Sequence, residues 1–109
     1  MPQIHRQRVV VEGLVSAPIG DPEICAFLSE LSERIDMVLL TEPVTHLSPT
    51  YGWAGWIHWE TSGAHFYAWD TPELFFSVDV YACKPFRAQD VVALAEEHFG
   101  CRELVFKEF

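Results

Sequence analysis

Two aromatic segments, Gly55 to Glu60 and Ala64 to Trp69, constrain the fold of this chain more than any other feature. Each reads as a strand, and the Ser62-Gly63 dipeptide between them suits a tight hairpin turn. A turn there predicts the cross-strand pairs Glu60 with His65, His58 with Tyr67, and Trp56 with Trp69. Since paired residues share a face, one face carries Trp56, His58, Glu60, His65, Tyr67 and Trp69, and the other carries Ile57, Trp59, Ala64, Phe66 and Ala68. Both faces are too aromatic to be left in water, so each needs a cover.

The remaining elements follow from hydrophobic periodicity. Further strands are predicted over Arg8 to Ser16, Met37 to His46 with a break at Pro43, Leu74 to Cys83, and Arg102 to Phe109. A helix is expected to open at Asp21-Pro22-Glu23 with Asp21 as its N-cap. Its buried stripe is Ile24, Phe27, Leu28, Leu31 and Ile35. A second helix is predicted over Ala88 to Phe99, with Gly100 as its C-terminal stop, and Ser48 to Gly52 is a predicted turn.

These elements predict one α+β domain over residues 1–109, with an antiparallel sheet and two helices on one of its faces. The second aromatic face then needs another cover, and a second copy of the chain is the simplest source. Sheet-to-sheet dimerisation would give a four-layer αββα sandwich. The alternative is a monomer whose aromatic groove receives a ligand.

Charge and composition exclude several classes of function. The formal net charge is −9, which repels phosphate backbones and argues against nucleic-acid binding. No apolar run approaches the roughly 20 residues that span a bilayer, and no signal-peptide pattern precedes the first strand, so we expect a cytoplasmic protein with no membrane contact. The three cysteines lack C-x-x-C spacing and suit reduced thiols. An acidic chain is compatible with a small cationic ligand, although an acidic solvated surface explains the same charge.

The stretch Gly63 to Phe86 contains a histidine strand, a Pro-Glu dipeptide and an apolar strand ending on a cysteine. The matching residues are His65, Pro72, Glu73, Val78, Asp79, Val80 and Cys83. Their order resembles the catalytic half of the small S-adenosylmethionine decarboxylases, the self-processing pyruvoyl enzymes of polyamine (spermidine) synthesis. Pro49 to Gly55 looks like that family's Pro-Tyr-Gly-x-Ser-Gly turn. The resemblance covers most of the chain and implies the same αββα dimer.

The resemblance also implies a chemistry. In the family, a serine hydroxyl attacks the carbonyl of the preceding Glu, and the new N-terminus becomes a pyruvoyl group, whose ketone accepts the electrons released when carbon dioxide leaves. Counting forward from Gly55 places that serine at Ser62, after Thr61. Counting backward from His65 and Pro72 places it at Ala64, which is the anchor we favour. Neither count gives Glu-Ser.

Other family groups are missing as well. On the backward count the processing histidine becomes Trp69, and the serine of the Gly-x-Ser-Gly turn becomes Ala54. Alanine has no nucleophile and tryptophan does not shuttle protons at neutral pH. Cys83, the family's proton donor in decarboxylation, remains, although a lone cysteine also serves as a small core residue. The economical interpretation is an unprocessed, ligand-binding or regulatory pseudoenzyme that needs no cofactor and pairs with itself or with an active paralogue. The alternative is cleavage at Thr61-Ser62, which makes Ser62 and Cys83 catalytic and generates a pyruvoyl-dependent decarboxylase of S-adenosylmethionine or another amino acid.

Candidate binding residues for S-adenosylmethionine or a polyamine follow from the same comparison. Glu73 matches a family glutamate that contacts the ligand's ribose, and Trp53 offers a ring for the adenine. His65 and Tyr67 complete the set, although a solvated turn carboxylate and aromatic core packing explain Glu73 and Trp53 equally simply. His58, Glu60 and His65 share a hairpin face, but without a defined fourth ligand we expect no metal.

Overall fold

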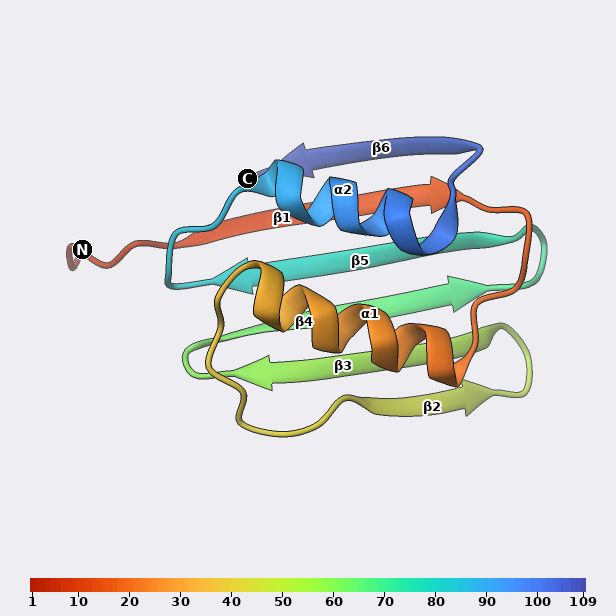
Figure 1. Ribbon diagram of the computed structural model, residues 1–109, viewed down its shortest axis with the longest axis horizontal. Helices are drawn as coiled ribbons and strands as arrows, with labels where there is room; N and C mark the ends of the chain where they lie inside the picture. Colours follow the sequence, from red (N-terminus) through yellow and green to blue (C-terminus); the bar gives the residue numbers. More distant parts are fainter.

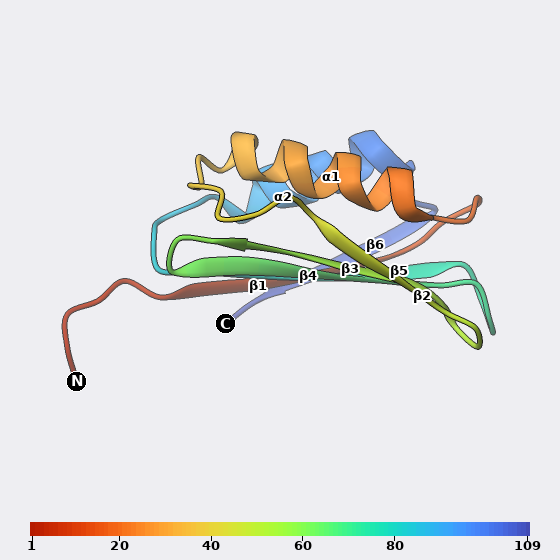
Figure 2. The ribbon, with the colours of Figure 1, turned by 90° about the horizontal axis from the view of Figure 1, so that it is seen from below.

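The sheet of this protein has six strands in the order β2-β3-β4-β5-β1-β6, as the computed structural model of residues 1–109 shows (Figure 1). The elements are β1 (Gln7–Leu14), α1 (Asp21–Arg34), β2 (Val44–Ser48), β3 (Gly52–Trp59), β4 (Ser62–Trp69), β5 (Phe75–Ala82), α2 (Ala88–Phe99) and β6 (Glu103–Glu108). All neighbouring strands are antiparallel. Both helices lie on one face and leave the other bare (Figure 2). The predicted α+β class with two helices on one face is therefore confirmed.

Alternating β-branched residues build the centre of the sheet. Val9 and Val11 of β1 are fully buried opposite Val80 and Val78 of β5. The intervening residues point to the bare face, because successive side chains of a strand alternate. We call this bare side the open face. Neither helix is long and apolar enough to cross a membrane.

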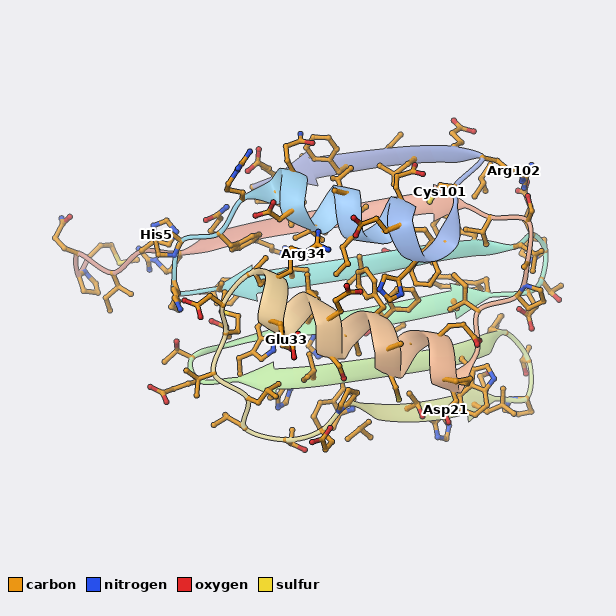
Figure 3. The ribbon with its side chains drawn as sticks, in the orientation of Figure 1. His5, Asp21, Glu33, Arg34, Cys101 and Arg102 are labelled. Carbon is orange, nitrogen blue, oxygen red and sulfur yellow. The ribbon has the colours of Figure 1, made fainter.

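The first helix buries the stripe that its periodicity predicts, from Ile24 to Ile35. Its N-cap is Gly20 and not Asp21, which is a correction. Glycine has no capping side chain, so Glu23 closes this end by accepting the Gly20 N–H at 2.7 Å. The Asp21 carboxylate instead accepts a hydrogen bond from Thr45 Oγ1 at 2.6 Å and ties the start of α1 to β2 (Figure 3).

The second helix ends as predicted. Gly100 adopts a left-handed conformation with φ 55° and donates its N–H to the Glu96 carbonyl, an arrangement that glycine makes without steric cost.

The β3–β4 hairpin differs from the prediction in its register. Its turn lies at Glu60 and Thr61, and Trp56 pairs with His65 and not with Trp69. The reason is a distant contact, because the buried Trp59 indole N–H donates to Ser32 Oγ of α1 at 2.7 Å and fixes the end of β3. The partner of Trp56 moves by four residues, an even number, so every residue keeps its predicted face. Ile57, Trp59, Ala64, Phe66 and Ala68 are accordingly buried under the helices.

The second strand is shorter than expected. Met37 to His46 was the predicted range, but β2 begins only at Val44, because Pro43 has no N–H to donate to a ladder. The earlier part contributes one isolated bridge between Leu39 and Trp59.

Candidate functional site

Ser62 and Cys83, the two candidate catalytic residues, meet at one end of the sheet. The Ser62 hydroxyl accepts a hydrogen bond from the Cys83 backbone N–H at 3.1 Å. Ser62 pairs with Trp59, whose ring is buried beneath α1. Since cross-strand partners share a face, the Ser62 side chain lies on the helix side of the sheet.

The alternative serine position lies in the hydrophobic core. Ala64 is fully buried and pairs with Val80 of β5. Its methyl group contributes to packing under the helices, and no polar side chain shares the pairing.

The residue before Ser62 has an unusual backbone conformation. Thr61 has φ 62°, a left-handed conformation that is strained for a β-branched residue. Its hydroxyl donates to the Glu60 carbonyl at 2.6 Å. The strain therefore lies in the two-residue turn that leads into Ser62.

Glu73 lies beside an aromatic surface at the opposite end of β4. We call this site the tryptophan pocket, a hollow of about 280 Å³ lined by Leu14, Trp69, Pro72, Glu73 and Phe75. The Trp69 and Phe75 rings have centroids 5.2 Å apart, and Tyr67 extends the row at 6.1 Å from Trp69. A carboxylate beside aromatic faces suits a cation that carries a planar group.

The other proposed binding residues are divided between the two faces. Tyr67 and His65 lie on the open face and are exposed. Trp53 pairs with Leu47 and packs against the core beside Gly20 at the start of α1. Strand alternation places Trp53 with Ile57 and Trp59, on the side away from Glu73.

His65 belongs to a second hollow, which we call the histidine pocket. It measures about 400 Å³ and is lined by Arg8, His58, Thr61, Ser62, Gly63, His65, Asp79 and Tyr81. The His58 and His65 ring centroids are 6.1 Å apart. Both imidazoles project on the open face, opposite to the side on which strand alternation directs the Ser62 hydroxyl.

Arg8 is a site residue that sequence reasoning missed. Its Nε and Nη2 donate to the two carboxylate oxygens of Asp79 at 2.9 and 2.8 Å, and the Phe109 ring lies 4.7 Å from the guanidinium carbon. The hydrogen bonds with Asp79, more than its charge, raise the pKa of Arg8. Only the pairing of β1 with β5 brings these residues together, so no local motif signals the contact.

The two other thiols are poor candidates for chemistry. Burial raises the pKa of Cys101 to about 11, and this residue lies in the link between α2 and β6 (Figure 3). The pKa of Cys25 is raised as well, mainly by burial and secondly by the hydrogen bond to Asp21. Both thiols therefore stay protonated at neutral pH, where the thiolate is the reactive form. No three His, Cys, Asp or Glu side chains lie close enough together to hold a metal ion.

Comparison with known proteins agrees with this fold. The family model described as S-adenosylmethionine decarboxylase matches residues 13–109. The crystal structure of the adenosylmethionine decarboxylase from Aquifex aeolicus superposes with a TM-score of 0.81 at 12% identity, covering 99% of this chain and 91% of that one. At that identity the likeness concerns the fold alone. No curated protein matches the chain.

Proposed function

Because the chain belongs to the S-adenosylmethionine decarboxylase family, we propose that it is an unprocessed, ligand-binding or regulatory member acting in polyamine (spermidine) biosynthesis in the cytoplasm. The observation that carries this proposal is the surroundings of Ser62. Its hydroxyl makes one hydrogen bond, accepted from the Cys83 backbone N–H. Strand alternation places the imidazoles of His58 and His65 on the other face. A serine that attacks its own backbone needs a proton acceptor at the hydroxyl, and none contacts it.

The residues present do not fit the family's pyruvoyl group. Ala54 stands where the family's turn has a serine, and on the backward count Trp69 stands at the processing histidine. On that count the serine position is Ala64, inside the core. We therefore derive no reaction step through a pyruvoyl group.

The tryptophan pocket supports binding without turnover. The Glu73 carboxylate would attract a sulfonium or ammonium group, while Trp69 and Phe75 offer faces for an adenine or an alkyl chain. We propose that S-adenosylmethionine, or a polyamine, occupies this pocket and remains chemically unchanged.

The open face supports a partner chain. Tyr67 and Tyr81 are each 43% exposed on it and Val105 is 58% exposed, although helices cover the other side of the sheet. We propose that a second copy, or an active paralogue, packs sheet to sheet against this surface. In a regulatory role the uncleaved chain would support the partner's activity through that interface.

Intact-mass spectrometry of freshly purified, denatured protein tests the proposal first. We expect one species at the full-length mass. Size-exclusion chromatography with light scattering then measures the oligomer, for which we expect a dimer. Calorimetric titration with S-adenosylmethionine measures binding, and carbon dioxide release is expected to stay at the level of a protein-free blank. Two fragments would overturn the proposal.

A second candidate function rests on a specific observation at the turn. The left-handed Thr61 strains the residue before Ser62, and Cys83 adjoins that serine. Residues held in strained backbone conformations cluster at active sites, where the strain is part of the mechanism. A decarboxylase formed by cleavage at Thr61-Ser62 would show two fragments in the same mass spectrum, and Ser62→Ala would abolish the split. Full-length wild-type protein with no carbon dioxide release would exclude it.

A further inference from the structure

The sheet has two free edges, and β6 forms the longer and more open one. β6 pairs with β1 on one side, and no strand lies on its other side. All but one of its six residues are exposed, and Figure 1 shows its outer edge free of any other element. The other edge strand, β2, has five residues between Pro43 and Pro49, which limit a further ladder because proline has no N–H to donate. An open edge such as that of β6 is a template for strand addition.

The pairing of β6 with β1 decides which main-chain groups of β6 point away from the sheet. Directly after β6, the Phe109 N–H donates to the Arg8 carbonyl at 3.0 Å. Hydrogen-bonded and non-hydrogen-bonded pairs alternate along an antiparallel ladder. The main-chain groups of Lys107 and Val105 therefore also point toward β1. Those at the even-numbered positions, Leu104 and Phe106 among them, point outward.

A second copy of β6 fits this edge in an antiparallel register with a twofold axis at Val105. Leu104 then lies opposite Phe106 of the second copy, so the outward main-chain groups of both meet as hydrogen-bonded pairs. The same register places Lys107 opposite Glu103 of the second copy, once on each side of the axis. These are non-hydrogen-bonded pairs, whose side chains lie closest together. Each copy therefore offers its cation to the other's carboxylate.

The neighbouring registers lack this match. With the twofold axis at Leu104, Lys107 would lie opposite Cys101, and with the axis at Phe106 it would lie opposite Val105. Neither position supplies a carboxylate. Charged side chains on an edge strand normally discourage pairing with another chain, but in the register centred on Val105 they attract each other.

The charge of this edge also departs from that of the whole protein. The formal net charge of the chain is −9, whereas the segment from Arg102 to Glu108 contains two basic and two acidic residues. Its last acidic residue, Glu108, falls opposite Arg102 of the second copy in the register centred on Val105. Two copies that repel each other elsewhere can therefore approach at this edge without a local excess of negative charge.

We propose that the β6 edge binds the β6 edge of a second copy, so that two six-stranded sheets continue as one. The contact is isologous, and the helices of both copies lie on the same side because the twofold axis is perpendicular to the sheet. It uses main-chain groups in the plane of the sheet, whereas the sheet-to-sheet pairing proposed above uses side chains on the open face, so both contacts fit in one assembly. A strand of six residues makes a contact smaller than a standard interface. Edge pairing therefore forms at high protein concentration, and the sheet-to-sheet dimer is the species expected in dilute solution.

Amide hydrogen exchange, followed by nuclear magnetic resonance in the full-length protein at low and high concentration, tests this contact. We expect the amides of Leu104 and Phe106 to exchange more slowly at the high concentration, because each gains a main-chain acceptor. The amides of Val105 and Lys107 point toward β1 and are the internal control. Packing on the open face supplies no acceptor to the outward amides. No slowing, or equal slowing of the control amides, would overturn the proposal.

Charge variants test the register by sedimentation equilibrium. Lys107→Glu sets like charges opposite each other on both sides of the axis and is expected to weaken the concentration-dependent association about tenfold. Glu103→Lys/Lys107→Glu restores opposite charges and is expected to recover the association, with backbone spectra confirming the fold. Arg87→Glu makes the same change of charge at an exposed position away from β6 and is the matched control, expected to associate as the wild type does. Unchanged association in Lys107→Glu, or no recovery in the double variant, would refute the pairing.

The two proposed contacts fail in different ways. A chain that is monomeric when dilute, yet gains protection at Leu104 and Phe106 when concentrated, would contradict the sheet-to-sheet dimer alone. A dimer whose mass and amide exchange do not change with concentration would contradict the edge contact alone.

Discussion

Removing the Ser32 hydroxyl tests the contact that fixes the hairpin register. Ser32 is the buried polar residue of the core, at 1% exposure, and its Oγ accepts the Trp59 indole N–H at 2.7 Å while donating to the Leu28 carbonyl at 2.7 Å. In Ser32→Ala the indole N–H remains buried without an acceptor, which costs about 1–3 kcal/mol. The Leu28 carbonyl keeps its helical partner, and the higher helix propensity of alanine returns about 0.5 kcal/mol.

We therefore expect Ser32→Ala to lower the free energy of unfolding by about 0.5–2.5 kcal/mol in urea titrations. For a domain of this size that is a fall in Tm of about 4–8 °C per kcal/mol. Ser29→Ala is the matched control, because Ser29 is exposed on the same helix, and it is expected to change stability by less than about 0.5 kcal/mol. A Ser32→Ala effect equal to that control would refute the reasoning.

A double-mutant cycle with Trp59→Phe isolates the hydrogen bond from the loss of ring area. We expect a coupling free energy of about 1 kcal/mol between the two positions, because the two side chains are in contact and buried away from water. Additive single effects would show that the bond does not contribute, and the explanation of the register through Trp59 would then be lost.

Three further predictions concern binding, backbone conformation and pH. Glu73→Gln is expected to weaken S-adenosylmethionine binding about tenfold by calorimetry, since it removes a charge-assisted contact, whereas Glu33→Gln on the outer side of α1 leaves it unchanged. Gly52→Ala is expected to lower unfolding free energy by about 1–3 kcal/mol in urea, because Gly52 has φ 142° and a Cβ there would lie 2.4 Å from the Ala68 carbonyl oxygen. A loss below about 0.5 kcal/mol would contradict it. Burial raises the pKa of Cys101 from 9.0 to about 11, so the folded protein keeps a proton that the unfolded chain loses, and stability falls as pH rises through that interval. Cys101→Ala is expected to fall less steeply, and parallel pH profiles would contradict this.

Sequence periodicity predicted the two faces of the hairpin but not its register. Alternation with period two is local, so Ile57 and Phe66 were assigned correctly to the buried side. The turn was placed at Ser62-Gly63 because glycine and serine favour turns. In the fold, Trp59 is held by α1, and the turn must follow it directly, even at the cost of a left-handed Thr61. A residue more than twenty positions away decides this, which no local propensity reports.

The candidate site shows the same division. The predicted strand began at Gly55, whereas β3 begins at Gly52. With the longer strand, alternation alone predicts that Trp53 lies on the helix side together with Ile57. The ion pair of Arg8 with Asp79 depends on β1 pairing with β5, so its partners are far apart in the chain. The meeting of Ser62 with the Cys83 N–H is likewise a product of strand order.

The family's fold and its chemistry depend on different residues in this chain. The fold requires apolar side chains at alternate positions and the Ser32–Trp59 anchor, and these lie on the helix side. By the resemblance, the family's chemistry would need a hydroxyl and an imidazole at the positions of Ala54 and Trp69, and neither residue belongs to the buried core. Fold similarity at 12% identity is therefore compatible with either presence or loss of activity. The mass of the intact chain separates these states, because cleavage at Thr61-Ser62 would give two fragments and an unprocessed chain gives one species.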